Sequence, residues 1–155
     1  MTNNQKLLTY FVKKHNTPTV TVLMKLCYLT DLISFKENHK RITDYKYIRY
    51  TFGPFTRNIY TDLESLVKED VLASKIEYGK FGQDTESVIY SLSENAPSVE
   101  LEEDTKAIVD ELLDKLGGHG AHALTNIAYK TKPMVALGAT LGGNEHIGEE
   151  LNLGA

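Results

Sequence analysis

The chain has 155 residues, a length that fits one domain with its own hydrophobic core. Its formal net charge of −4 disfavours a generic nucleic-acid binder, although a local basic patch is still compatible with it. Its single cysteine, Cys27, excludes an intramolecular disulfide and a cysteine-only metal site. No stretch approaches the roughly 18 apolar residues of a membrane span, and the start lacks the apolar run of a signal peptide. We therefore expect a cytoplasmic protein.

The first predicted helix follows Asn3 or Asn4, either of which can accept a hydrogen bond from an unpaired backbone N–H at the helix start. The segment Thr17-Pro18-Thr19 ends this helix. Its apolar residues recur at helical spacing and form one stripe, which consists of Leu7, Leu8, Phe11 and Val12.

The second helix is predicted from about Thr19 or Thr21 to Asn38. Its apolar residues cover more than half of its circumference, which is typical of a central and mostly buried helix. Cys27 lies in its middle and is interpreted as a small buried apolar residue, because free cysteine usually behaves in that way.

A corner rich in aromatic rings comes next. Residues 45–60 hold four of the nine tyrosines and two of the five phenylalanines. The segment up to Phe52 is predicted to be extended, whereas Pro54 suits the first turn of a helix because it lacks the N–H that would be unpaired there. The corner is therefore predicted to join a short strand directly to a helix, whose apolar stripe consists of Phe55, Ile59, Leu63, Leu66 and Val67.

Two segments of alternating character, residues 74–78 and 87–92, predict the strands of an antiparallel β-hairpin. Gly79, Gly82 and Asp84 supply turn residues between them. A helix followed by such a hairpin is typical of winged-helix domains, and it is also common in domains that never contact DNA.

Two more helices are predicted. Acidic residues crowd the first turn of one, near residues 100–104, and Gly117-Gly118 ends it. The other spans about residues 120–131, and Lys132-Pro133 ends it. The predicted fold class is mainly α with a small antiparallel β-hairpin (α+β), as one domain of residues 1–137. A glycine-rich tail of residues 138–155 is expected to be loosely structured, although a short terminal helix could dock through Ile147, Leu151 and Leu153.

Basic residues share the corner with the aromatic residues. Between Lys36 and Arg57 there are six basic residues against two acids, and arginine beside tyrosine is a pairing enriched at protein interfaces. The hypothesis is a partner-binding surface, and the alternative is that the rings serve only the core. The predicted surface residues are Tyr47, Arg49, Tyr50, Arg57 and Tyr60, whereas structural roles are assigned to Phe52, Gly53, Pro54 and Phe55, with Phe52 and Phe55 as the expected core members.

The sequence does not predict a catalytic or metal site. His119 and His122 have a spacing found in metal sites, and Glu145-His146 could add ligands, but flanking glycines would hold such ligands poorly. The segment Gly117-Gly118-His119-Gly120 precedes a helix, as a phosphate-binding loop does. Such a loop also follows a strand, and no strand is predicted before this segment. We therefore expect no metal, no cofactor and no enzymatic activity.

Three segments together resemble a known family. Leu23-Met24-Lys25-Leu26-Cys27-Tyr28-Leu29 resembles the leucine–lysine–leucine–tyrosine helix of the Panacea domain, which occurs in SocA- and GepA-like, phage-associated antitoxins. Tyr50-Thr51-Phe52-Gly53-Pro54, followed by Ile59-Tyr60, is similar to the aromatic Gly-Pro corner of that family, and Leu124 to Pro133 is similar to its final helix. The similarity extends over about residues 5–137. Relatives often have histidine near Tyr129 and tryptophan where this chain has Met134.

The resemblance implies an antitoxin that neutralises a toxin encoded beside it, usually on a prophage or another mobile element. Such a domain either blocks the toxin by binding or delivers it, as an adaptor, to a Clp-type protease. The alternative function is a winged-helix regulator that binds DNA. Its recognition helix would be residues 56–68, in which Arg57 and Lys68 are balanced by Asp62 and Glu64, so this helix is poorly charged for phosphate contacts.

Overall fold

A computed structural model describes residues 1–78 and 86–155, which form six helices and two small antiparallel sheets. The predicted α+β class is therefore confirmed. The helices are α1 (Asn3–Lys14), α2 (Val20–Asn38), α3 (Asn58–Lys68), α4 (Glu103–Leu116), α5 (Ala121–Tyr129) and α6 (Lys132–Leu137). The strands are β1 (Ile48–Tyr50) and β2 (Gly53–Phe55), which pair with each other, and β3 (Leu72–Tyr78) and β4 (Glu86–Leu92), which form the second sheet. None of the helices in the described residues is long and apolar enough to cross a membrane.

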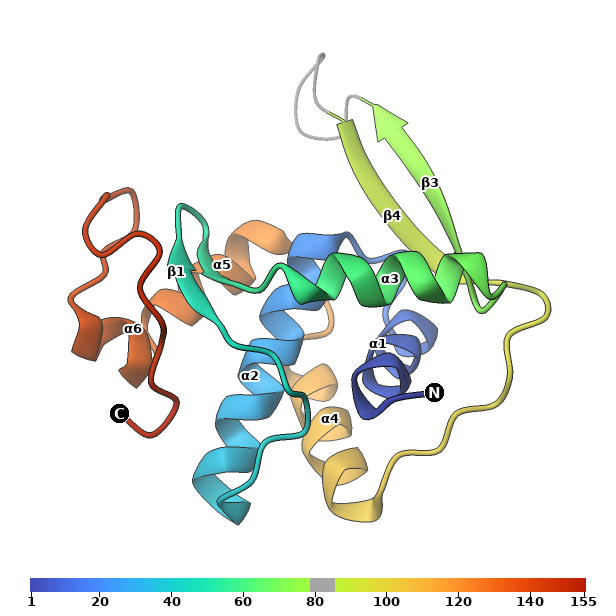
Figure 1. Ribbon diagram of the computed structural model, residues 1–155, viewed down its shortest axis with the longest axis horizontal. Helices are drawn as coiled ribbons and strands as arrows, with labels where there is room; N and C mark the ends of the chain where they lie inside the picture. Colours follow the sequence, from blue (N-terminus) through green and yellow to red (C-terminus); the bar gives the residue numbers. More distant parts are fainter. Residues whose placement is uncertain (79–85) are drawn as a thin grey trace.

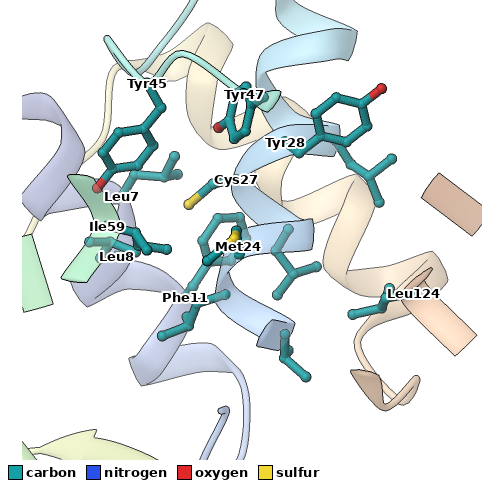
Figure 2. Packing of buried hydrophobic residues seen from close by; sticks show 14 of the residues in the cluster. Leu7, Leu8, Phe11, Met24, Cys27, Tyr28, Tyr45, Tyr47, Ile59 and Leu124 are labelled. Carbon is teal, nitrogen blue, oxygen red and sulfur yellow. The ribbon is translucent and has the colours of Figure 1, made fainter. Parts of the chain in front are cut away.

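Helix α2 runs through the middle of the molecule, as its broad apolar face predicts (Figure 1). It contacts α1, α3, α4, α5, β2 and β4. Leu26 and Leu29 are buried, and Cys27 is a fully buried free thiol. Figure 2 shows the rings of Tyr45 and Tyr47 next to Cys27, in a core that also receives side chains from α1 and α3. The core therefore surrounds α2 rather than lying along one side of it.

Helix α1 begins one residue earlier than the sequence suggests, because Thr2 caps it in place of Asn3 or Asn4. The Thr2 hydroxyl accepts a hydrogen bond from Gln5 N at 3.1 Å, and the Gln5 side chain accepts one from Thr2 N at 3.0 Å. This reciprocal pair satisfies two backbone N–H groups at the helix start. Asn4 is instead buried, and its side chain donates to Asp44 and Asp62.

The corner differs from the predicted strand-to-helix junction. Gly53 and Pro54 belong to a strand, β2, which turns back on β1 with Tyr50 opposite Gly53, and α3 begins only at Asn58. Gly53 has a φ of +99°, a conformation that residues with a Cβ rarely adopt. Proline is tolerated in an edge strand of a two-stranded sheet, so Pro54 extends the chain here instead of starting the helix.

The predicted β-hairpin is confirmed. Strands β3 and β4 pair from Leu72 opposite Leu92 to Tyr78 opposite Glu86, and the predicted turn residues Gly79, Gly82 and Asp84 lie outside the described residues. The base of the hairpin is held by the body of the protein, since Tyr90 N donates to Pro18 O at 3.0 Å. Its outer part projects away from the helices above α3 (Figure 1).

Pro133 begins a helix rather than ending one. Helix α5 ends at Tyr129, and Pro133 lies in the first turn of α6, where a missing N–H removes no helical hydrogen bond. Met134 is fully buried in the core.

The glycine-rich tail docks onto the body without forming the short terminal helix that its apolar residues allow. It lies beside β1, which both Figure 1 and three backbone hydrogen bonds show. Arg49 N donates to Glu149 O at 2.8 Å, Gly148 N donates to Arg49 O at 2.7 Å, and Leu151 N donates to Tyr47 O at 2.8 Å. Leu151 and Leu153 are buried, whereas Ile147 is exposed. The tail therefore acts as an irregular third strand along β1.

The central position of α2 gives a test of the core. We expect Leu26→Ala to lower the free energy of unfolding by about 2–5 kcal/mol, because it removes packing contacts and leaves a cavity in a fully buried site. The matched control is Val135→Ala on α6, an exposed apolar position where a change within about ±0.5 kcal/mol is expected. Urea unfolding followed by circular dichroism measures both, and equal effects would contradict the central role of α2.

Candidate protein-binding surface

The chain that leads into the corner is fixed by one buried carboxylate, that of Asp31 on α2. Asp31 accepts hydrogen bonds from Ile42 N at 2.8 Å, from Thr43 N at 2.9 Å and from the Tyr47 hydroxyl at 2.7 Å, and the Thr43 hydroxyl adds a fourth. Asp31 and Thr43 are buried. Burial removes the water that would hydrate the carboxylate, and these four donors take the place of that water. The four hydrogen bonds therefore hold residues 42–47 against α2.

Tyr47, which was predicted to belong to the surface, is a core residue. Its ring meets those of Tyr28 and Tyr45 edge to face, with centroids 5.3 Å and 6.2 Å away. Burial and the neighbouring Asp31 carboxylate raise the pKa of its hydroxyl well above the usual value, so Tyr47 remains a donor to Asp31. The physical reason for the correction is this hydrogen bond, which draws the hydroxyl into the interior.

Arg49, also predicted to lie on the surface, is fully buried under the tail. Its guanidinium donates to the carbonyls of Tyr50, Thr140 (3.1 Å) and Gly143 (2.8 Å) and lies over the Tyr129 ring, 5.2 Å from its centroid. Backbone carbonyls and an aromatic face therefore take the place of an acidic partner. Arg49 joins β1 to the tail, and it is not available to another protein in this structure.

The other predicted surface residues lie together at the outside of the corner. Tyr50 is 46% exposed and Tyr60 is 44% exposed, and Arg57 is exposed at the start of α3. Phe52, which was expected in the core, is 68% exposed because it occupies the turn between β1 and β2. Phe55 is half-buried, and its ring lies between those of Tyr50 and Tyr60, with centroids 5.0 Å and 6.1 Å away. We call these four rings, Tyr50, Phe52, Phe55 and Tyr60, the corner patch.

A groove continues from the corner patch along α3. It lies between this helix and the β3–β4 hairpin, has a volume of approximately 810 Å³, and shares Tyr60 with the corner patch. Ser74 and Tyr90, which are opposite each other in the hairpin, form its wall. We call it the hairpin groove, and the α3 residues that line it are Tyr60, Thr61, Leu63, Glu64, Ser65, Val67 and Lys68.

The wall of the hairpin groove extends beyond the body of the protein. Side chains two residues apart in a strand point to the same face, so Ile76 and Val88 share the face of Ser74 and Tyr90. Ile76, Val88 and Tyr78 are all exposed large side chains. Together the corner patch and the hairpin groove form an extended apolar and aromatic surface with polar residues beside it, the kind of surface that marks protein interaction sites.

A small pocket opens inside the corner patch, and Lys25 of α2 lies in it. The pocket has a volume of approximately 170 Å³ and is lined by Thr21, Met24, Lys25, Gly53 and the four rings of the corner patch. Lys25 is only 3% exposed, and its ammonium donates to Pro54 O at 2.9 Å. Burial lowers the pKa of Lys25 from 10.5 to about 8.

The histidine residues do not form a cluster. Among the described residues, no three histidine, cysteine, aspartate or glutamate side chains lie close enough together to hold a metal ion. His119 follows the end of α4, whereas His146 lies in the tail beside Glu149.

Sequence reasoning identified the corner but missed Lys25, Asp31 and the hairpin groove. A signal for the first two was present: a charged residue in a helix that is apolar on most sides has to be buried and needs polar partners. Lys25 and Asp31 are two such residues of α2. The sequence holds no comparable signal for the hairpin groove. This groove exists because of the angle between α3 and the hairpin, and packing at the base of the hairpin sets that angle.

Comparison with known proteins identifies a family but no individual relative. The model of the family described as antitoxin SocA-like, Panacea domain, matches residues 23–133, which is more than half of the chain. The match begins within α2, includes both sheets and the candidate surface, and ends within α6. Comparison with curated proteins and with solved structures gives no match.

The lowered pKa of Lys25 predicts a pH dependence of stability. Between about pH 8 and pH 10.5 the unfolded chain still holds the Lys25 proton while the folded chain releases it, so stability should rise with pH in that window. We expect the wild-type free energy of unfolding, taken relative to Lys25→Met, to rise by about 1.4 kcal/mol per pH unit there. Urea unfolding of both proteins from about pH 7 to about pH 10 measures the difference, in which shared effects of the tyrosines cancel. A constant difference would show that Lys25 titrates normally.

The burial of Arg49 predicts that the tail depends on it. Arg49→Met leaves the Thr140 and Gly143 carbonyls without their donor, and we expect a loss of stability of about 1–3 kcal/mol together with faster proteolysis after residue 138. Arg57→Met, at an exposed arginine of the same corner, is the matched control and should change stability by less than about 0.5 kcal/mol. Limited proteolysis with mass spectrometry locates the cleavage. An equally protected tail in Arg49→Met would refute its attachment through Arg49.

Proposed function

The chain belongs to the SocA-like antitoxin family that carries the Panacea domain, and we propose that it neutralises a toxin protein by binding it through the corner patch and the hairpin groove. The family supports an antitoxin-type role and, in general, a toxin as the partner. The proposed setting is the cytoplasm, with the toxin encoded beside this chain on a prophage or another mobile element.

The observation that carries the proposal is the exposure of large apolar side chains on one connected surface. Phe52, Tyr50 and Tyr60 in the corner, and Tyr78, Ile76 and Val88 on the hairpin, are among the most exposed large apolar residues of the described chain. Burial of such side chains under another surface stabilises the complex, and aromatic residues dominate the binding energy of many protein interfaces. A concave groove beside a projecting hairpin suits a folded partner or one of its helices.

The proposed activity is binding without catalysis. Cys27 and Tyr47 are enclosed in the core, where burial raises the pKa of each group well above its usual value. Their partners are structural, as the bond from Tyr47 to Asp31 shows. Neutralisation therefore follows from covering the toxin or from carrying it to a protease of the Clp type.

DNA is the less favoured partner, although α3 and the β3–β4 hairpin follow each other as in a winged-helix domain. The exposed charged residues from the start of α3 to the loop after it are Arg57, Glu64, Lys68, Glu69 and Asp70. Acids outnumber bases in this set, whereas binding to the phosphate backbone needs several cations that face it. The surface charge thus favours a protein partner.

The corner patch can be tested with two substitutions. We expect Phe52→Ala and Tyr60→Ala each to weaken the complex with the neighbouring gene product by about 2 kcal/mol or more if these rings are anchors, while the isolated protein keeps its stability within about 0.5 kcal/mol. Val135→Ala on α6, an exposed apolar residue outside both parts of the surface, is the matched control. Isothermal titration calorimetry measures affinity, and circular dichroism checks the fold.

Two further measurements separate the mechanisms. Inhibition of the purified toxin by stoichiometric antitoxin, without any protease, supports direct blocking, whereas neutralisation only in the presence of a Clp-type protease supports delivery.

If no protein partner co-purifies, and promoter DNA binds in a steeply salt-dependent manner that Arg57→Ala abolishes, the antitoxin proposal is wrong and the winged-helix alternative holds.

A further inference from the structure

The pocket inside the corner patch is lined by one positively charged side chain and by aromatic rings. Among the described residues that line it, Lys25 is the one with a formal charge, and the remaining lining consists of four aromatic rings with Thr21, Met24 and Gly53. Its volume of approximately 170 Å³ exceeds that of one water molecule, which occupies about 30 Å³ in the liquid, several-fold. A side-chain group of a few heavy atoms therefore fits.

The Lys25 ammonium is buried without an acidic partner. Within the described residues its acceptor is the Pro54 carbonyl, and no aspartate or glutamate lies within ion-pair distance. An ammonium group has three N–H donors, so a single carbonyl leaves capacity for further acceptors. A buried cation that lacks a counter-charge costs free energy, and an anion brought by a partner offsets that cost.

We propose that this pocket receives a carboxylate of the toxin, which forms an ion pair with Lys25 while the corner patch covers the rest of the contact. The inference rests on the proposed function, because it names the chemical group by which that partner is recognised. The rings of Tyr50, Phe52, Phe55 and Tyr60 exclude water around the ion pair, and an ion pair is stronger where water is excluded.

The chemistry of the pocket selects a carboxylate over a phosphate. The single Lys25 cation provides charge for a singly charged group, whereas a phosphate or a nucleic-acid backbone is usually held by several cations. Among the exposed charged residues from the start of α3 to the loop after it, the acids Glu64, Glu69 and Asp70 outnumber the bases Arg57 and Lys68. That negative charge disfavours a polyanion but is compatible with a single acidic side chain that enters a pocket.

Lys25 also has a structural role through its bond to Pro54, and the test has to separate the two roles. We use a double-mutant cycle in which every aspartate and glutamate of the neighbouring gene product is replaced singly by asparagine or glutamine. Each toxin variant is titrated against the wild-type antitoxin and against Lys25→Met. A loss of fold lowers the affinity of Lys25→Met for all toxin variants alike, whereas a direct ion pair couples Lys25 to one acid alone.

We expect one toxin substitution to weaken binding to the wild type by about tenfold or more and to change binding to Lys25→Met by less than about twofold. A toxin extended at its C-terminus by a short glycine–serine segment distinguishes a C-terminal carboxylate from a side chain. Lys13→Met, at an exposed lysine of α1, controls for the change in net charge.

A second measurement uses the unaltered antitoxin, in case Lys25→Met does not fold. Treatment of the complex with a water-soluble carbodiimide joins an amine to a carboxylate that it contacts, and the carbodiimide takes up the water that is lost. We expect a cross-linked peptide between Lys25 and an acidic residue or the C-terminus of the toxin, identified by mass spectrometry. If the complex forms but shows neither the cross-link nor the coupling, the carboxylate inference is overturned and the proposed function stands. If no complex forms, the proposed function itself fails.

Discussion

The geometry of the corner depends on the buried carboxylate of Asp31. Its four hydrogen bonds fix residues 42–47 against α2, and they determine where β1 begins and which face each residue presents. Because side chains alternate along an extended chain, fixing Tyr45 and Tyr47 inward sets the phase of the strand that follows. An uncharged replacement would leave several buried donors without an acceptor, and the cost would extend to the position of the whole corner.

Lys25 holds the other side of the same corner. It lies six residues before Asp31 on α2, and its ammonium binds the Pro54 carbonyl of β2, while Asp31 binds the segment before β1. One helix therefore positions, with opposite charges, both the segment that leads into β1 and the strand β2. Arg49 adds a third buried charge, which ties β1 to the tail. Charged side chains thus orient the corner, whereas the apolar residues of α2 provide most of the free energy of the core.

The sequence predicts five of the six helices that the structure describes, together with the β3–β4 hairpin, because these features depend on local patterns. It does not predict α6, because Pro133 is expected there to end a helix. It does not predict which aromatic residues of the corner are exposed. Tyr47 and Tyr50 have similar neighbours in the sequence, but the bond to Asp31 draws Tyr47 inward, and Tyr50, three residues later, lies on the opposite face and is exposed. Phe52 is exposed because Gly53 permits a tight turn with a φ of +99°. The preference of proline for the first turn of a helix does not predict this turn. Arg49 resembles a surface cation until the tail, some ninety residues later, supplies its carbonyl partners.

The division between core and surface at the corner has a thermodynamic consequence. Tyr28, Tyr45 and Tyr47 each bury their rings and stabilise the fold, so their presence needs no partner. Phe52 in the turn, and Ile76, Val88 and Tyr78 on the outer hairpin, have exposed side chains that contribute little to folding. Large apolar side chains at exposed positions promote aggregation unless something covers them. In the proposed function, a toxin that covers the corner patch and the hairpin groove removes this liability and gains binding free energy from the same area.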